Sequence, residues 1–343
     1  MNDASRALAL DIGGTKIALA TVREDGKIVR EASLPTESER GFASGIVRIR
    51  ASVLSLLAES GWAVGSFAGI GVGCAGPVDP ARGTIDNPFT LPGWEGGNVV
   101  AALGEAFSCP VVLENDADAA ILGECWRGAG RGKDPVLMLT FGTGIGGAAF
   151  VAGGLLRGAG GAHPEPGHVI ADPAGPSCYC GAHGCFESLA SGTALSAAAE
   201  RGGFGDARKL LARAATGDPA AGALRARALT ATANAAFTLL HALFPERVIL
   251  GGGMMDEHYE PFAEAVRSAI ARATTLPGRG VSVVRAELGN RAGLVGGARL
   301  VFEHLCREQP VAPRPDPARP PRSPAGSVAP RPRSGSGRAR RSR

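Results

Sequence analysis

The sequence predicts an α/β protein built from two similar halves with a cleft between them. Residues 7–22 read as an apolar strand, a glycine-rich turn and a second apolar strand, and residues 136–151 repeat this plan about 129 positions later. Strands also alternate with helical segments along most of the chain. With 343 residues and 45% hydrophobic content, the chain can form one large or two ordinary domains with their own cores.

The other elements follow from local patterns. Between the hairpins we expect a helix over 45–57, a strand over 69–74, a turn over 75–79, a strand over 111–113 and a helix over 117–126. After the second hairpin we expect helices within the alanine-rich residues 192–243, a strand over 247–250 that leads into a triple glycine, and a last helix over 294–306.

Charge separates a body from a tail. Residues 311–343 contain nine Arg, one Asp and eight Pro, so they carry +8 while the remaining 310 residues carry −4. We therefore expect residues 307–343 to be disordered. Such a tail can touch nucleic acid or acidic surfaces without specificity, but a passive extension is the simpler interpretation, and we expect no specific nucleic-acid partner.

The expected location is the cytoplasm. No apolar run approaches the roughly 18 residues of a membrane span, so no membrane association is expected. The N-terminus has an early acid and no long apolar core, which argues against a signal peptide. The seven cysteines are an odd number without an export signal, which indicates a reducing compartment.

The two glycine-rich hairpin tips are candidate phosphate cradles, because glycine lets backbone N–H groups approach an anion closely. In the first tip, Asp11 could bind Mg²⁺ and Lys16 could pair with phosphate. No GxxxxGK[ST] motif is present. Residues 142–147 satisfy GxGxxG, but strand and turn follow them rather than the helix of a dinucleotide site. Taken alone, either loop could also be a tight hairpin without a ligand.

Asn115 and Asp116 stand where a short apolar strand ends and a helix begins. Backbone N–H groups are free at such a corner, and ligands collect at strand ends in α/β folds. The alternative is a plain helix N-cap, for which Asn and Asp are favoured.

A metal site is predicted from His168, Cys178, Cys180 and Cys185, a Cys₃His set suited to tetrahedral zinc. His183 lies inside the same loop and is the rival fourth ligand. Three reduced cysteines without a metal are the alternative. Four protein ligands leave no open position, so the zinc would be structural.

Several of these segments resemble a known family. Asp11-Ile-Gly-Gly-Thr-Lys16, Gly142-Thr-Gly-Ile-Gly-Gly147 and Gly251-Gly-Gly253 are similar to the phosphate and adenosine segments of the actin/hexokinase/Hsp70 ATPase superfamily and, more closely, of the ROK family (repressor, open reading frame, kinase) of bacterial sugar kinases. The resemblance spans residues 6–305. It implies a two-lobed, actin-like (ribonuclease H-like) fold, with a smaller lobe at 1–118, a larger lobe at 119–293, and the helix 294–306 returning to the smaller lobe.

The resemblance also implies an ATP-dependent hexose kinase that uses Mg²⁺ and a structural Zn²⁺, in a homodimer or homotetramer. Asp116 is the implied general base. The implied sugar-binding residues are Gly76, Asn115, Asp116, Glu165, His168 and Glu187. The residues implied for ATP and Mg²⁺ are Asp11, Gly13, Gly14, Thr15, Lys16, Thr143, Gly144, Gly251, Gly252 and Gly253.

The identity of the sugar stays open. His163-Pro164 stands where many members of the family have small residues, and fructokinase-like members can carry His-Pro-Glu there. Glucose is the favoured hexose, and fructose, mannose and N-acetylated hexosamines are the alternatives. From residue type alone, Glu165 and Glu187 could also be solvated surface acids.

Two other classes of function are weighed against the kinase. The family includes repressors with an added N-terminal helix-turn-helix domain, for which no room is expected because the first strand starts near Arg6. A non-catalytic sugar- or nucleotide-binding relic is disfavoured by the intact Asp11, Asp116 and glycine loops.

Overall fold

The first hairpin opens a five-stranded sheet in the order β3-β2-β1-β4-β8. The computed structural model describes residues 5–275 and 280–308, so the predicted disordered tail lies almost entirely outside the described residues. The strands of this first sheet are β1 (Arg6–Ile12), β2 (Lys16–Arg23), β3 (Ile28–Pro35), β4 (Ile70–Cys74) and β8 (Val111–Asn115). β1 pairs antiparallel with β2 and parallel with β4, which in turn pairs parallel with β8.

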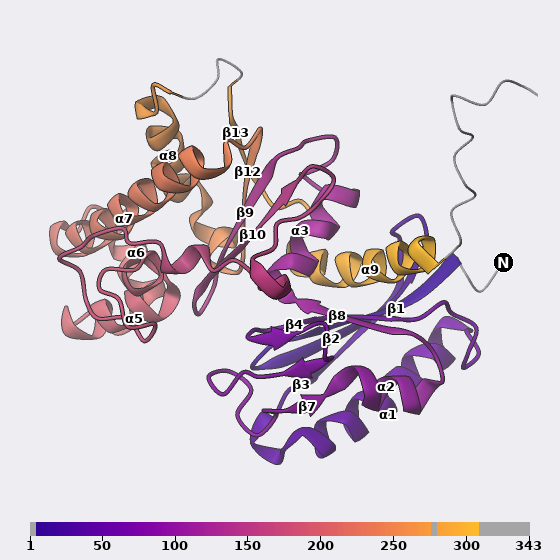
Figure 1. The fold of residues 1–343 in the computed structure, drawn as a ribbon. Helices are drawn as coiled ribbons and strands as arrows, with labels where there is room; N and C mark the ends of the chain where they lie inside the picture. Colours follow the sequence, from indigo (N-terminus) through magenta and orange to yellow (C-terminus); the bar gives the residue numbers. More distant parts are fainter. Residues whose placement is uncertain (1–4, 276–279, 309–343) are drawn as a thin grey trace, which may run out of the picture. The chain divides into compact units, whose positions relative to one another are not determined.

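Both faces of the first sheet are covered. Leu8, Leu10 and Ile12 of β1 share a core with α1 (Phe42–Ser60) and α2 (Val99–Phe107). The alternate residues Ala7 and Ala9 share a second core with α9 (Ala292–Glu308). Figure 1 shows α1 and α2 below this sheet and α9 above it. Because successive side chains of a strand point to opposite faces, the apolar run from Ala7 to Leu10 in β1 is what a sheet covered on both sides requires.

The second hairpin opens a second five-stranded sheet, in the order β11-β10-β9-β12-β13. Its strands are β9 (Val136–Phe141), β10 (Ile145–Val151), β11 (Gly154–Leu155), β12 (Arg247–Gly251) and β13 (Ser282–Arg285). β9 pairs antiparallel with β10 and parallel with β12, just as β1 pairs with β2 and β4. The repeat seen in the sequence is therefore also a repeat of topology.

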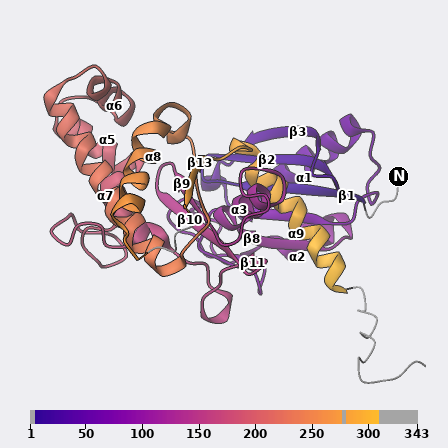
Figure 2. The ribbon, with the colours of Figure 1, turned by 90° about the horizontal axis from the view of Figure 1, so that it is seen from above.

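A layer of helices covers one face of the second sheet, with α7 and α8 on its far side from α3 (Figure 1, Figure 2). These helices are α4 (Phe186–Ala190), α5 (Gly192–Arg201), α6 (Ala207–Ala215), α7 (Pro219–Leu243) and α8 (Met254–Arg272). The helical prediction for residues 192–243 is thus confirmed. Smaller elements are a three-stranded sheet of β5 (Val78–Asp79), β6 (Thr84–Ile85) and β7 (Gly97–Asn98), and the 3-10 turns Ser38–Arg40, Ala159–Gly161, Pro166–His168 and Gly289–Arg291.

Helix α3 (Asp116–Arg127) packs against both sheets. Its residues Ala117 and Ile121 lie in one apolar cluster with Met138 of β9. On the first sheet, a Cβ added to Gly73 of β4 would lie 3.0 Å from the Ala119 Cβ. The corner where β8 becomes α3 therefore stands where the two sheets meet, which positions the site described below. The lobe boundary at residue 118 remains a prediction.

Helix α9 crosses β4 at a contact that only glycine permits. A Cβ on Gly71 would lie 1.8 Å from the backbone oxygen of Gly297. We expect Gly71→Ala to lower the free energy of unfolding by about 1–3 kcal/mol, because the helix must move away from the sheet. The matched control is Gly222→Ala in α7, where no atom lies within 4 Å of the added Cβ. Gly222→Ala is expected to raise the free energy of unfolding by roughly 0.5–1 kcal/mol. Denaturant unfolding of both variants checks the pair, and equal effects would contradict it.

The strands and helices expected from the sequence are confirmed, with small shifts at their ends. The largest shift is in the first helix, expected over 45–57 and observed as Phe42–Ser60. β3, α2, α8 and β13 were not expected. Among the described residues, no helix combines the length and the hydropathy that crossing a lipid bilayer requires.

Candidate active site

A cleft of about 380 Å³ lies where the first hairpin, α3, β9 and the start of α9 meet. Seven of the residues predicted to form the site line it: Asp11, Gly13, Gly14, Thr15, Lys16, Asp116 and Gly252. The lining also includes Asn290 and Gly293, which the sequence did not single out. Glycine is needed at 293, because a Cβ there would lie 2.7 Å from Asp11 Oδ2.

Asp11 is a partly buried carboxylate that faces this cleft. Burial, first, and the nearby charge of Asp116 raise its pKa to about 7, although the charge of Lys16 opposes them. Two neighbouring carboxylates with little access to solvent repel each other, and a bound cation would lower the energetic cost of keeping both ionised. The residues present therefore fit a Mg²⁺ site.

The sequence allows two roles at the start of this helix, an N-cap and a residue facing the ligand, and Asn115 and Asp116 differ in which one they fit. Asn115 is the N-cap of α3: its Oδ1 accepts hydrogen bonds from the backbone N–H groups of Ala117 (2.8 Å) and Asp118 (3.4 Å). Its amide Nδ2 faces Gly76, where an added Cβ would lie only 2.7 Å away. Asp116 is the first residue of the helix and faces the cleft, so the capping alternative applies to Asn115.

The surroundings of Asp116 raise its affinity for a proton. Burial raises the pKa of its carboxyl, and a hydrogen bond from the Ala117 N–H to Oδ1 (2.8 Å) opposes that effect in part, as does the charge of His163. A carboxylate with a raised pKa accepts a proton more readily than a free one.

A second cavity of about 690 Å³ lies between the tip of the second hairpin and helices α5, α6 and α8. Thr143 and Gly253, both predicted to bind ATP, line it together with Gly142. Backbone hydrogen bonds from Gly192 to Gly142 (2.9 Å) and from Thr193 to Thr143 (3.1 Å) fix the hairpin tip on α5. Of the predicted nucleotide residues, Gly144 and Gly251 line neither cavity.

The predicted sugar-binding carboxylates lie beside the second hairpin. Glu187 Oε2 accepts a hydrogen bond from the Ile145 N–H (2.8 Å), and a Cβ on Gly144 would lie 2.4 Å from the same oxygen. Burial raises the pKa of Glu165, while His163 and His168 lower it and Glu187 raises it. Glu165 and Glu187 therefore share one neighbourhood, rather than standing on separate surfaces.

Two aromatic residues at this side were not predicted from the sequence. The Tyr179 ring meets the His168 ring edge-on, with centroids 5.0 Å apart, and packs on Phe89 at 5.4 Å. Phe89 belongs to the loop between β6 and β7, so this pair connects that loop to the cysteine-rich loop. Burial and the nearby Glu187 raise the pKa of the Tyr179 phenol, which keeps it protonated as a donor.

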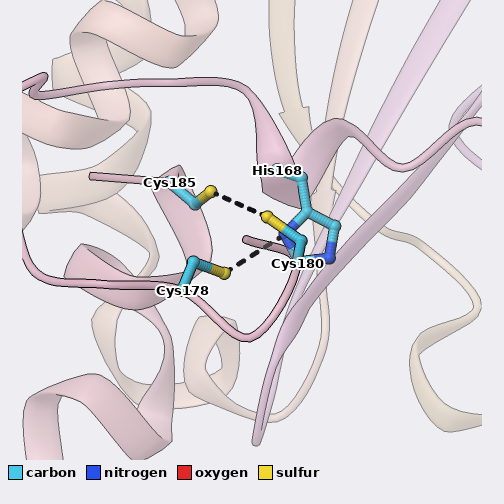
Figure 3. A group of neighbouring side chains, drawn as sticks. All are labelled: His168, Cys178, Cys180 and Cys185. Carbon is cyan, nitrogen blue, oxygen red and sulfur yellow. Dashed lines mark hydrogen bonds between the residues drawn. The ribbon is translucent and has the colours of Figure 1, made fainter. Parts of the chain in front are cut away.

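The predicted metal ligands converge (Figure 3). One ligand atom from each of His168, Cys178, Cys180 and Cys185 lies within 4.8 Å of all the others. Cys178 Sγ is 3.5 Å from His168 Nδ1, and Cys180 Sγ is 3.5 Å from Cys185 Sγ. Zn–S bonds of 2.3 Å in a tetrahedron place sulfurs about 3.8 Å apart, so these four side chains fit a zinc ion. His183 instead has its Nδ1 3.4 Å from Ser177 Oγ and is not in the group.

One polar network in the site was not predicted from the sequence, although one of its members, His163, was singled out there for another reason. Arg157, after β11, pairs with Glu114 Oε2 (2.5 Å) and with Asp118 Oδ2. His163 Nδ1 lies 2.6 Å from the same Asp118 oxygen. The partners are about 40 positions apart in the chain, and no short motif relates them.

Comparisons with known proteins agree with this geometry. A family model described as "ROK family" matches residues 7–304. A glucokinase of Thermotoga maritima is 34% identical over 319 residues, covering 88% of this chain and 98% of that protein. Among solved structures, a ROK hexokinase from Thermus thermophilus superposes with a TM-score of 0.78 at 34% identity, covering 88% of this chain and 99% of that one.

A further solved structure was determined with ligands. It is a ROK family glucokinase from Streptomyces griseus in complex with glucose and AMPPNP, with a TM-score of 0.71, 31% identity, and coverage of 86% of this chain and 98% of that one. The predicted two-lobed fold is confirmed by these similarities. By the match over nearly all of its described length, the chain belongs to the ROK family.

Proposed function

We propose that this protein is an ATP-dependent hexose kinase that transfers the γ-phosphoryl group of ATP to the 6-hydroxyl of a hexose, with glucose as the preferred sugar. The observation that carries the proposal is the position of Asp116. It faces a cleft that also holds Asp11 and Lys16 of the first glycine hairpin. The glucokinase names of relatives, and the glucose and AMPPNP in the Streptomyces griseus structure, support the same reaction.

In the proposed mechanism, Asp116 accepts the proton of the sugar hydroxyl as the hydroxyl attacks phosphorus. The Asn115 amide, held by its capping bonds, donates to a neighbouring hydroxyl. Glu165 and Glu187 accept hydrogen bonds from other hydroxyls. Since the Nδ1 of His168 faces Cys178, its Nε2 is left to meet the sugar.

On the nucleotide side, the glycine tips offer backbone N–H groups to the phosphates and Lys16 offers a charge. Mg²⁺, when bound, neutralises charge on the transferring group. Phosphoryl transfer depends mainly on positioning and on electrostatic stabilisation, which is what the residues of this cleft supply.

A coupled ADP-release assay tests the proposal with glucose, fructose, mannose and an N-acetylated hexosamine as acceptors. We expect the highest kcat/KM with glucose. No ADP release with any hexose would refute the kinase and leave a sugar-binding regulator or relic. A higher kcat/KM with fructose would refute only the choice of sugar, in the direction that His163-Pro164 indicates.

Assembly into a dimer or tetramer is part of the proposal and rests on the family resemblance. Light scattering of the purified chain tests it, and a monomer at micromolar concentration would contradict it. The cytoplasmic location remains a prediction from the sequence.

A further inference from the structure

Acidic residues alternate along the corner where β8 becomes α3, at 114, 116 and 118. Asp116 lines the cleft, whereas its two acidic neighbours bind side chains of the segment that follows β11. Arg157 pairs with both Glu114 and Asp118, and His163 shares the Asp118 oxygen. We call these four residues, Glu114, Asp118, Arg157 and His163, the Asp118 clasp.

The side chains of the clasp are more buried than those of an ordinary surface ion pair. The Asp118 side chain is 0% exposed, and those of His163 and Arg157 are 14% and 23% exposed. Burying a carboxylate is costly unless charged partners surround it. Asp118 Oδ1 has no hydrogen-bond partner among the described residues, so its stabilisation comes through Oδ2, where both cations meet.

The charge state of the clasp follows from its neighbours. Burial lowers the pKa of His163, but its hydrogen bond to Asp118 and the charges of Asp118 and Glu165 outweigh this and raise the pKa overall, against the opposing charge of Arg157. The protonated imidazolium is therefore favoured, and the contact to Asp118 is charge-assisted.

The segment that the clasp holds is a short glycine-rich turn, closed by a backbone hydrogen bond from Gly158 N–H to Ala162 O (2.8 Å). Between Arg157 and His163 runs Gly-Ala-Gly-Gly-Ala, with Gly160 and Gly161 at positive φ and residues 158–161 exposed. Such a sequence has little conformational preference of its own. The anchors stand at its two ends, and Glu165 follows the second anchor by two residues, across a proline that restricts the backbone.

We propose that His163 and Arg157 are positioning residues. Through their contacts with Asp118, they hold the carboxylate of Glu165, the proposed sugar-binding residue, at a fixed place relative to Asp116. This inference rests on the proposed function, since it concerns the relative placement of two groups that are proposed to meet the hexose. The ion pairs of the clasp join the β8–α3 corner to the segment after β11, and none of them includes a residue of the two glycine tips proposed to bind phosphate. We therefore expect the clasp to affect the sugar rather than ATP.

The test compares His163→Ala with His163→Asn. The alanine variant loses the bond to Asp118, and we expect the KM for hexose to rise about 10- to 100-fold, the range for a hydrogen bond to a charged group, with the KM for ATP unchanged. Asparagine places an amide nitrogen where Nδ1 stood and can still donate to Asp118, so we expect recovery to within about threefold of wild type.

Three further measurements separate positioning from stability. First, glucose affinity by calorimetry without ATP reports the same effect independently of turnover. Second, Asp118→Asn combined with His163→Ala is expected to cost little more than either change alone, because both act through one contact. Third, Arg213→Ala removes an exposed Arg–Asp pair between α6 and the start of α7 (2.7 Å to Asp218) and is expected to leave both KM values unchanged.

The outcomes that would refute the positioning role differ from the outcome that would refute the kinase activity. An unchanged hexose KM and affinity in folded His163→Ala, or an equal rise in the KM values of hexose and ATP, refutes the positioning role. The same holds if asparagine fails to rescue, or if the double variant shows additive losses. Wild-type protein that binds glucose without releasing ADP refutes the kinase alone, and the affinity series then still decides the clasp.

Discussion

Asp116→Asn is expected to lower kcat by about 10²- to 10⁴-fold, the range that a positioned general base contributes. The amide cannot accept the hydroxyl proton, while its size and its place at the start of α3 are unchanged. Glucose affinity is expected to remain near the wild-type value, because the substitution leaves the proposed sugar contacts of Glu165, Glu187 and Asn115 in place. The measurements are steady-state kinetics for kcat and calorimetry for affinity.

The same substitution distinguishes a base from a helix cap. Asparagine is as good an N-cap as aspartate, so a residue that only caps should tolerate the change. Asp218 provides the matched control: its Oδ1 accepts from the N–H groups of Ala220 (3.0 Å) and Ala221 (3.1 Å) at the start of α7. Asp218→Asn should therefore leave kcat unchanged. Equal kcat values for the two variants and the wild type would remove Asp116 from its role.

The parts of the fold that the sequence predicts well are those whose signal is local. Both hairpins combine apolar strands with glycine tips, and each buried strand is a short apolar run between turn residues. The elements that were missed have weaker patterns. β3 is an edge strand with several exposed residues, and α8 carries Pro261 and a non-helical His258 within its span. In these cases the packing of the rest of the chain decides the conformation.

The residues of the site also fall into those that a local sequence pattern predicts and those that it does not. The group of four candidate metal ligands is found from the sequence because three of the four lie within eight residues, a spacing typical of a loop around a metal. The Asp118 clasp is not, because its members are brought together only by the pairing of β10 with β11 and by the position of α3. An Arg or a buried Asp in isolation carries no sign of its partner.

A second large effect is expected at the metal site. Purified protein should contain about one zinc per chain, and Cys180→Ser should reduce it to a small fraction of that, because a hydroxyl is a far weaker zinc ligand than a thiolate. A zinc ion held by all four ligands would join the turn around Cys178 to His168 and Cys185. Losing it should lower Tm by about 10 °C or more and raise the KM for hexose, since His168 then loses its fixed orientation.

The control for this change is Cys306→Ser, an exposed cysteine outside the group of four. Zinc content by mass spectrometry and Tm by scanning fluorimetry should separate the two variants, with Cys306→Ser behaving as wild type. A wild-type protein that is metal-free, stable and fully active would contradict the zinc assignment. A Cys180→Ser variant that loses zinc but keeps its hexose KM would show instead that the metal stabilises the loop without orienting His168 toward the sugar.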